Sequence, residues 1–145
     1  MDAIDKKIIA LLEENARIPL KKIAAQVFLS PPAVSARIER LENKGIITGY
    51  RAVLSPETLG YHIMAFINVV LSPDQHEEFC IFVKECPNVT ECYHVAGYFS
   101  MLIKACFQTT QEMNSFVAQV QRFGTTQTQV VFTSVIERRE PSAAI

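Results

Sequence analysis

Basic side chains gather in the first third of this 145-residue chain. Between Arg17 and Lys44 there are six Lys and Arg residues against two acidic residues, a local charge of +4, whereas the whole chain carries −1. Ammonium and guanidinium groups bind DNA phosphates, and arginine also reads guanine edges in the major groove. The basic patch is modest, so we expect a salt-dependent affinity for double-stranded DNA rather than very tight binding.

Three helices are predicted to carry these basic groups. Asp2 is a suitable cap for the first helix, and apolar spacing predicts a second helix of only two turns, from Leu20 to Val27. Ser30 and Pro31 form a start signal for a third helix, and Gly45 is suited to end it. A short helix, a tight turn and a further helix predict a helix-turn-helix, whose second helix enters the major groove.

The third helix is expected to show small side chains near its start and arginines further along its outer face. Small groups permit close approach to DNA, Arg37 and Arg40 can reach guanine edges or phosphates, and Lys21 and Lys22 are placed for phosphates. The candidate DNA contacts are Lys21, Lys22, Ser30, Pro32, Ala33, Ser35, Ala36, Arg37 and Arg40. Periodicity alone also allows the bland interpretation, a solvated basic face on a three-helix bundle.

Beyond Ile46 the pattern changes from helical to extended. We expect a DNA-binding domain at 1–50, a linker at 51–60, a second domain at 61–137 and a loose tail at 138–145. The second domain reads as βαββαβ, with Ser72-Pro73 opening one helix and a Thr109/Glu112 capping box opening the other. The expected strands are Tyr61–Leu71, Val89–Val95, Phe99–Phe107 and Thr126–Ile136.

Such a domain is an antiparallel sheet with both helices on one face, so the fold class is α+β. Phe66, Val70 and Phe132 alternate with other apolar residues, so both faces of the sheet carry apolar groups. We therefore expect a second subunit to cover the open face, with a merely apolar exposed surface as the alternative.

The helix-turn-helix segment resembles one known family. The run Ile18-Pro-Leu-Lys-Lys-Ile-Ala, followed by Leu29-Ser-Pro-Pro-Ala-Val-Ser-Ala-Arg-Ile-Glu-Arg-Leu-Glu-Asn-Lys-Gly-Ile-Ile, is similar to that of the Lrp/AsnC regulators of bacteria and archaea. The resemblance covers nearly the whole chain. It implies a winged-type helix-turn-helix, a β-linker and a ferredoxin-like ligand-sensing domain. It also implies homodimers that assemble into tetramers, octamers or larger, with an amino-acid effector bound between dimers.

In that family the turn between the two central strands helps form the effector pocket. The corresponding stretch here includes Gly97, Tyr98, Phe99 and Ser100, and the resemblance adds His94 and Gln129 on adjoining strands. Ser100 stands where the family usually has Asp, which removes a carboxylate that can receive an ammonium group. Three possibilities stay open: a different ligand, another acid that supplies the contact, or an empty site.

Other functions find less support. There is no secretory signal or membrane span, which predicts a cytoplasmic protein. The four cysteines form no CxxC pair and read as buried reduced thiols, and neither metal nor cofactor is expected. A few proteins with this scaffold decarboxylate haem precursors, but His62, His76 and His94 show no catalytic spacing. The more serious rival is an architectural protein that wraps DNA without an effector.

Overall fold

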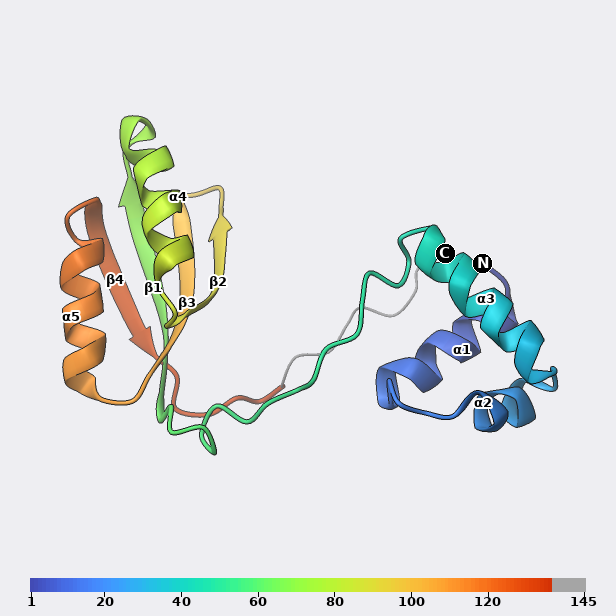
Figure 1. The fold of residues 1–145 in the computed structure, drawn as a ribbon. Coiled ribbons are helices and arrows are strands. Elements are labelled where there is room, and N and C mark those ends of the chain that lie inside the picture. Colours follow the sequence, from blue (N-terminus) through green and yellow to red (C-terminus); the bar gives the residue numbers. More distant parts are fainter. Residues whose placement is uncertain (137–145) are drawn as a thin grey trace. The chain divides into compact units, whose positions relative to one another are not determined.

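The computed structural model describes residues 1–136 and divides them into two compact units, one built from residues 1–53 and the other from 54–135 (Figure 1). Each unit has its own apolar core. The tail expected at 138–145 lies outside the described residues, as does Glu137 at the end of the expected second domain.

The first unit contains three helices, α1 (Ala3–Glu14), α2 (Leu20–Val27) and α3 (Pro31–Asn43). The predicted caps are confirmed: Asp2 accepts a hydrogen bond from the Asp5 backbone, and Ser30 accepts one from Ala33. Gly45 follows α3 with a φ of +67°, the left-handed conformation that favours glycine after a helix. The core of the unit is formed by Ile8, Ile23, Ala24, Val27 and Val34.

The second unit has the predicted βαββαβ order. Its elements are β1 (Ile63–Leu71), a 3₁₀ turn η1 (Pro73–Gln75), α4 (His76–Glu85), β2 (Val89–His94), β3 (Met101–Phe107), α5 (Thr110–Val120) and β4 (Gly124–Val130). The four strands form an antiparallel sheet in the order β2-β3-β1-β4, which confirms the α+β class. At the start of α5 the predicted cap is confirmed, because Thr109 Oγ1 accepts from Glu112 N; the Glu112 carboxylate accepts from Gln108 N, one residue before the cap.

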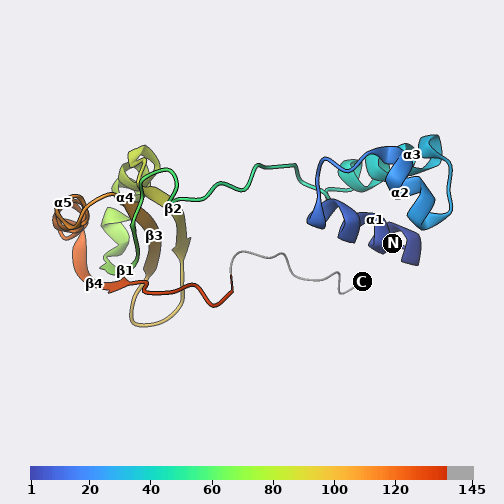
Figure 2. The same cartoon turned by 90° about the horizontal axis from the view of Figure 1, so that it is seen from below.

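Both helices cover one face of the sheet (Figures 1 and 2). Ala65, Ile67 and Val69 of β1 are fully buried against this helical layer, in one core with Phe79 of α4 and Phe116 of α5. Successive side chains of a strand point to opposite faces, so the intervening residues of β1 lie on the face without helices. That open face includes Met64, Phe66, Asn68, Val70, Leu102, Lys104, Gln127 and Gln129.

Two extended regions differ from the prediction. The last strand is expected to run to Ile136, but β4 ends at Val130, opposite Ala65 near the start of β1. Val131 N still donates to Met64 O at 2.8 Å, but residues 131–136 form no strand and Phe132 is 99% exposed. The segment that contains the expected β-linker also differs: residues 44–62 form no strand in the described chain.

Candidate functional site

The small side chains expected to approach DNA lie on the surface of the first unit. Pro32, Ser35 and Ala36 are exposed on the first half of α3, and Ala33 is half-buried beside them. Ser30 is exposed at the start of the helix, where its hydroxyl caps Ala33 at 3.4 Å. The opposite side of α3 is anchored in the core by Val34 and Leu41, which are at most 1% exposed. The exposed surface of α3 is therefore uncharged over residues 31–36.

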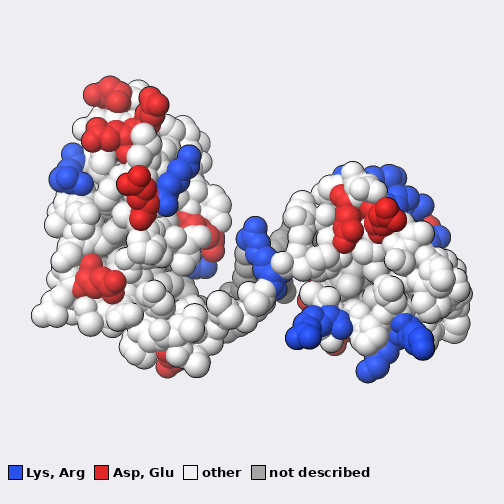
Figure 3. Space-filling view, viewed as in Figure 1, with Lys and Arg blue, Asp and Glu red and all other residues white. Residues whose placement is uncertain are grey.

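Lys21 and Lys22 are exposed on α2, which packs against α3. In the view of Figure 3, Lys and Arg lie at several edges of the unit that contains α1 to α3, with acidic and uncharged surface between them. This view contains no continuous basic face, in keeping with the small net charge of the segment. Lysines beside an uncharged helix surface can bind DNA phosphates while the helix faces the bases.

The turn between α2 and α3 contains an unusual residue. Phe28 caps α2 in the left-handed conformation, with φ 55° and ψ 42°, and is 91% exposed. It is the only residue other than glycine with a positive φ among the described residues. The conformation lets Leu29 donate to the carbonyl oxygen of Ala24 at 3.1 Å, which turns the chain into α3. No sequence signal predicts this conformation at Phe28, because the residue is neither glycine nor asparagine.

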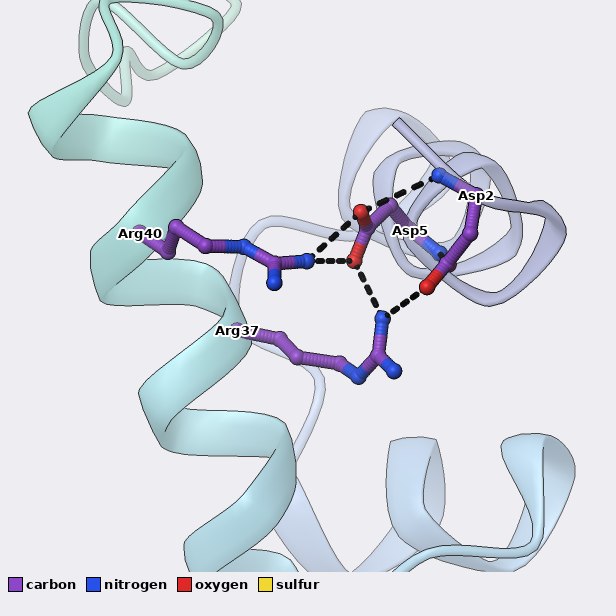
Figure 4. Close-up of polar contacts among 4 residues, drawn as sticks. All are labelled: Asp2, Asp5, Arg37 and Arg40. Atoms are coloured by element: carbon purple, nitrogen blue, oxygen red, sulfur yellow. Dashed lines mark hydrogen bonds and ion pairs between the residues drawn. The ribbon is translucent and has the colours of Figure 1, made fainter.

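The two arginines of α3 are directed at α1 rather than away from the domain (Figure 4). Arg37 Nη1 lies 2.6 Å from Asp2 Oδ2 and 2.7 Å from Asp5 Oδ1. Arg40 Nη2 donates to both oxygens of Asp5, at 2.9 and 2.8 Å. Both guanidinium groups, which the sequence places on the outer face of this helix, are therefore bound to carboxylates at the start of α1.

Asp5 is the buried centre of this charge cluster, with only 2% of its surface exposed. Burial disfavours the charged form, but hydrogen bonds from Arg37 and from the Asp2 backbone outweigh it and lower the pKa of Asp5. The same contacts raise the pKa of Arg37, mainly through Asp2 and then Asp5. Asp5 stands three residues after the cap Asp2, a spacing that predicts a capping box. The sequence therefore contained a signal for a structural role of Asp5.

In the second unit, the predicted effector turn joins β2 to β3 and is closed by a hydrogen bond from Val95 N to Ser100 O at 2.8 Å. Gly97 has a φ of +139°, which side-chain-bearing residues rarely adopt. Tyr98 is 80% exposed, and its ring meets that of Phe99 edge-on with centroids 5.0 Å apart. The turn therefore holds two aromatic rings at the surface.

Ser100 is bound to the end of β1. Its hydroxyl accepts from Leu71 N at 2.9 Å and lies within reach of the carbonyl oxygens of Val69 and Leu71, at 3.3 and 3.5 Å. Its backbone N also donates to Val69 O at 3.0 Å. These bonds continue the pairing of β1 with β3 beyond Met101. The Ser100 hydroxyl, at the position where the family described above usually has Asp, thus hydrogen-bonds to the backbone of the sheet.

An open pocket of about 410 Å³ lies beside Ser100, between the end of β1, the start of α4 and the end of β2. It is lined by Leu71, Ser72, Pro73, His76, His94 and Ser100. The structure thus brings together two of the predicted effector residues, His94 and Ser100, and adds four residues that no sequence pattern assigns to a site. These four come from the β1–α4 connection, whose approach to the turn depends on strand order.

Gln129 does not join this group within one chain. His94 and Gln129 are predicted on adjoining strands, but their strands, β2 and β4, are the two opposite edges of the sheet. Gln129 pairs with Phe66 on the open face, whereas His94 pairs with Met101, which is buried on the helical face. The expectation of adjoining strands is wrong because β1, not β2, is the neighbour of β4.

Other kinds of site find little material in the described residues. All four cysteines are free thiols there, with Cys106 buried and the others half-buried, and burial raises the pKa of Cys86, Cys92 and Cys106. Within residues 1–136, no cluster of three His, Cys, Asp or Glu side chains is arranged to hold a metal ion. Nor does any helix in that range have the length and apolar character needed to cross a membrane.

Comparison with known proteins gives matches over both units. Residues 1–42 match the AsnC-type helix-turn-helix domain, and residues 64–141 match the Lrp/AsnC ligand binding domain. The proline dehydrogenase transcriptional activator of Rhodobacter capsulatus is 37% identical over 98% of this chain and 97% of its own length. The regulator LrpC of Bacillus subtilis is 26% identical over 93% of this chain and 94% of its own.

Solved structures show the same architecture. A transcriptional regulator of Neisseria meningitidis, in complex with L-methionine, superposes with a TM-score of 0.89 at 30% identity, covering 99% of this chain and 96% of that one. AsnC of E. coli superposes with a TM-score of 0.88 at 28% identity, covering 97% of both chains.

Proposed function

Because this chain belongs to the Lrp/AsnC family of transcriptional regulators, we propose that α3 lies in the major groove of operator DNA and that a small molecule bound by the second unit changes operator affinity. The chain is a DNA-binding regulator with a ligand-binding domain, and not an enzyme. We place it in the cytoplasm, with residues 51–60 as the linker between the two functions.

The exposed, uncharged first half of α3 carries the DNA proposal. Short side chains approach the bases, because they leave room for the helix in the groove. They belong to Ser30, Pro32, Ala33, Ser35 and Ala36. Lys21 and Lys22 bind phosphates and set the position of the helix. Arg40 is 48% exposed and can contact a phosphate while it stays bound to Asp5; Arg37 is only 24% exposed, so its contact is smaller.

Binding of labelled operator fragments tests this placement. Ser35→Asp puts a negative charge against the DNA and should abolish binding, whereas Ser115→Asp, on the exposed side of α5, should leave it unchanged. Lys22→Ala should weaken binding to all sequences alike and lower the salt dependence by about one phosphate contact. Unchanged affinity of the Ser35→Asp protein would refute the placement of α3.

Footprinting distinguishes the regulator from an architectural protein. We expect a few strong palindromic sites, because a dimer presents two copies of α3 in twofold symmetry. A long phased footprint with similar affinity for many sequences would favour DNA wrapping instead.

We propose that an amino acid or a related metabolite is the effector, bound near Gly97 and Ser100 beside the exposed Tyr98 and the half-buried Phe99. The match to a ligand-binding domain, the pocket at Ser100 and the L-methionine complex of the Neisseria relative support this. Operator affinity measured with and without each of the twenty amino acids tests the response. A ligand that binds one assembly better must shift the population toward it.

The open face of the sheet supports a homodimer as the basic unit, from which tetramers, octamers or larger rings assemble. Phe66, Val70 and Leu102 lie half-buried on this face, and Phe132 and Val135 beyond β4 are 99% and 94% exposed. Apolar surface of this extent is usually covered by a partner. Pairing of two such faces would also bring Gln129 of one subunit toward the other subunit.

Sedimentation of two charge variants tests the dimer. Phe66→Glu places a charge on the open face and should yield monomers at micromolar concentration. Ile81→Glu is the control, because Ile81 is 53% exposed on α4 but lies on the helical side of the sheet. A wild-type protein that sediments as a monomer would refute the interface.

A further inference from the structure

The pocket beside Ser100 offers imidazole rings and no carboxylate. His76 and His94 both line it, with ring centroids 5.3 Å apart. None of the six lining residues is acidic. Asp74 and Glu77 flank His76 in the sequence, but both are exposed and neither lines the pocket. The lining therefore lacks the group that an ammonium ligand needs most.

The two hydroxyls of the lining are already engaged. Ser72 Oγ donates to Gln75 Oε1 at 3.2 Å, and the Ser100 hydroxyl accepts from Leu71 N while its single proton faces backbone carbonyl oxygens. A hydroxyl has only one proton to donate. Neither serine carries a charge, so neither replaces a carboxylate as the partner of an ammonium group.

The histidines are suited to the opposite charge. Nδ1 of His76 lies 3.7 Å from the Cys80 thiol, and a thiol that donates to Nδ1 leaves the ring proton on Nε2. An imidazole N–H, whether neutral or cationic, donates to a carboxylate. Two rings at this separation can each donate to one oxygen of the same carboxylate, while Leu71 and Pro73 supply an apolar wall for the rest of the ligand.

We infer that the pocket binds a small organic acid through its carboxylate, with His76 and His94 as donors, and that an α-ammonium group is dispensable. This inference rests on the proposed effector response and specifies its chemistry: α-keto and α-hydroxy acids bind at least as well as the amino acids that share their side chains. The carboxylate is the recognised group, and the side chain adds apolar contact with Leu71 and Pro73.

Calorimetry of the full chain with matched sets of ligands tests this. Each set contains an amino acid, the α-keto acid with the same side chain and the amine left by decarboxylation, for leucine, methionine and phenylalanine. At least one α-keto acid should bind as tightly as its amino acid or more tightly, and no amine should bind. An amino acid that binds tenfold more tightly than its α-keto acid, or no heat with any acid, overturns the inference.

Histidine variants locate the site. His76→Ala and His94→Ala should each weaken α-keto acid binding about tenfold or more, the loss expected for one hydrogen bond to a charged group. His62→Ala is the control, because His62 is exposed in the same unit but does not line the pocket. Unchanged affinity in both pocket variants, in protein with wild-type circular dichroism, overturns the site.

Ser100→Asp supplies a third readout. A carboxylate at this position can still accept from Leu71 N, and its second oxygen adds a partner for an ammonium group. The ratio of amino acid to α-keto acid affinity should rise at least tenfold; an unchanged ratio counts against the inference. Operator binding is measured on the same preparations, so failure of DNA binding would refute the proposed function while the ligand titrations still judge the pocket.

Discussion

The two surfaces assigned to function are held in place by different forces. In the first unit, a buried carboxylate on α1 binds two arginines of α3, so ion pairs set the position of the helix proposed to read DNA. In the second unit, the turn that borders the pocket is held by uncharged hydrogen bonds between Ser100 and the end of β1. The position of α3 therefore depends on the ionisation of Asp5, whereas the position of the β2–β3 turn depends on hydrogen bonds to the backbone of β1.

This difference shows which residues the fold uses and which it leaves for a ligand. Three side chains predicted to contact a ligand or DNA instead form hydrogen bonds within their own unit. They are those of Arg37, Arg40 and Ser100. The groups left at the surface are small side chains on α3 and imidazoles beside the pocket. A residue type therefore indicates a function only after its partners within the fold are known.

The largest effect is expected where the ion pairs are removed. Asp5→Ala deprives both arginines of a buried, charged acceptor and should lower the free energy of unfolding of the first unit by about 2 kcal/mol. Urea unfolding followed by circular dichroism measures this. Glu13→Ala, exposed on the same helix, should change stability by less than about 0.5 kcal/mol. Equal effects of the two changes would mean that Asp5 does not anchor α3.

Acid should weaken the first unit through the same contacts. The pKa of Asp5 is lowered from its ordinary value of 3.8, so its stabilising contribution is fully present above that value and is lost as the pH falls through the lower pKa of the folded state. Thermal midpoints from pH 6 to pH 3, measured for the wild type and Asp5→Asn, test this. The wild type should lose more stability over that range; parallel curves would contradict the prediction.

The turn of the second unit should depend on backbone freedom rather than on charge. Gly97→Ala forces a Cβ onto a φ of +139° and should cost about 1 kcal/mol, although a Cβ would meet no neighbouring atom within 4 Å. Ala96→Ser, at the adjacent exposed position, serves as the control and should be nearly neutral. Denaturant unfolding of the three proteins checks the cost, and an unaffected Gly97→Ala protein would show that the turn relaxes.

The smallest effect should have the opposite sign. Phe28 adopts the left-handed conformation without being glycine, so Phe28→Gly should stabilise the first unit by about 0.5 kcal/mol, after the greater flexibility of unfolded glycine is subtracted. Phe28→Ala removes the ring but keeps the Cβ, and it should bring no such gain. Thermal unfolding compares the two variants, and a gain in both would assign the effect to the exposed ring.

Local signals in the chain predicted most of the elements. Asp2, Ser30 and Thr109 cap helices where expected, and α2 spans the predicted Leu20–Val27, because a cap, a proline and an apolar spacing act over one or two turns. The βαββαβ order and the α+β class follow from the alternation of periodicities along the chain. The family could also be identified from the α2–α3 segment.

Contacts between segments that are distant in the sequence could not be predicted from such local signals. The sequence contains Asp5, Arg37 and Arg40, but only the packing of α1 against α3 brings the carboxylate to the two guanidinium groups. Likewise, the order β2-β3-β1-β4 separates Gln129 from His94, and α4 places His76 beside His94. Periodicity describes the surroundings of a residue along its own element, whereas strand order and helix packing are set by the burial of apolar faces between elements, which only the folded chain reveals.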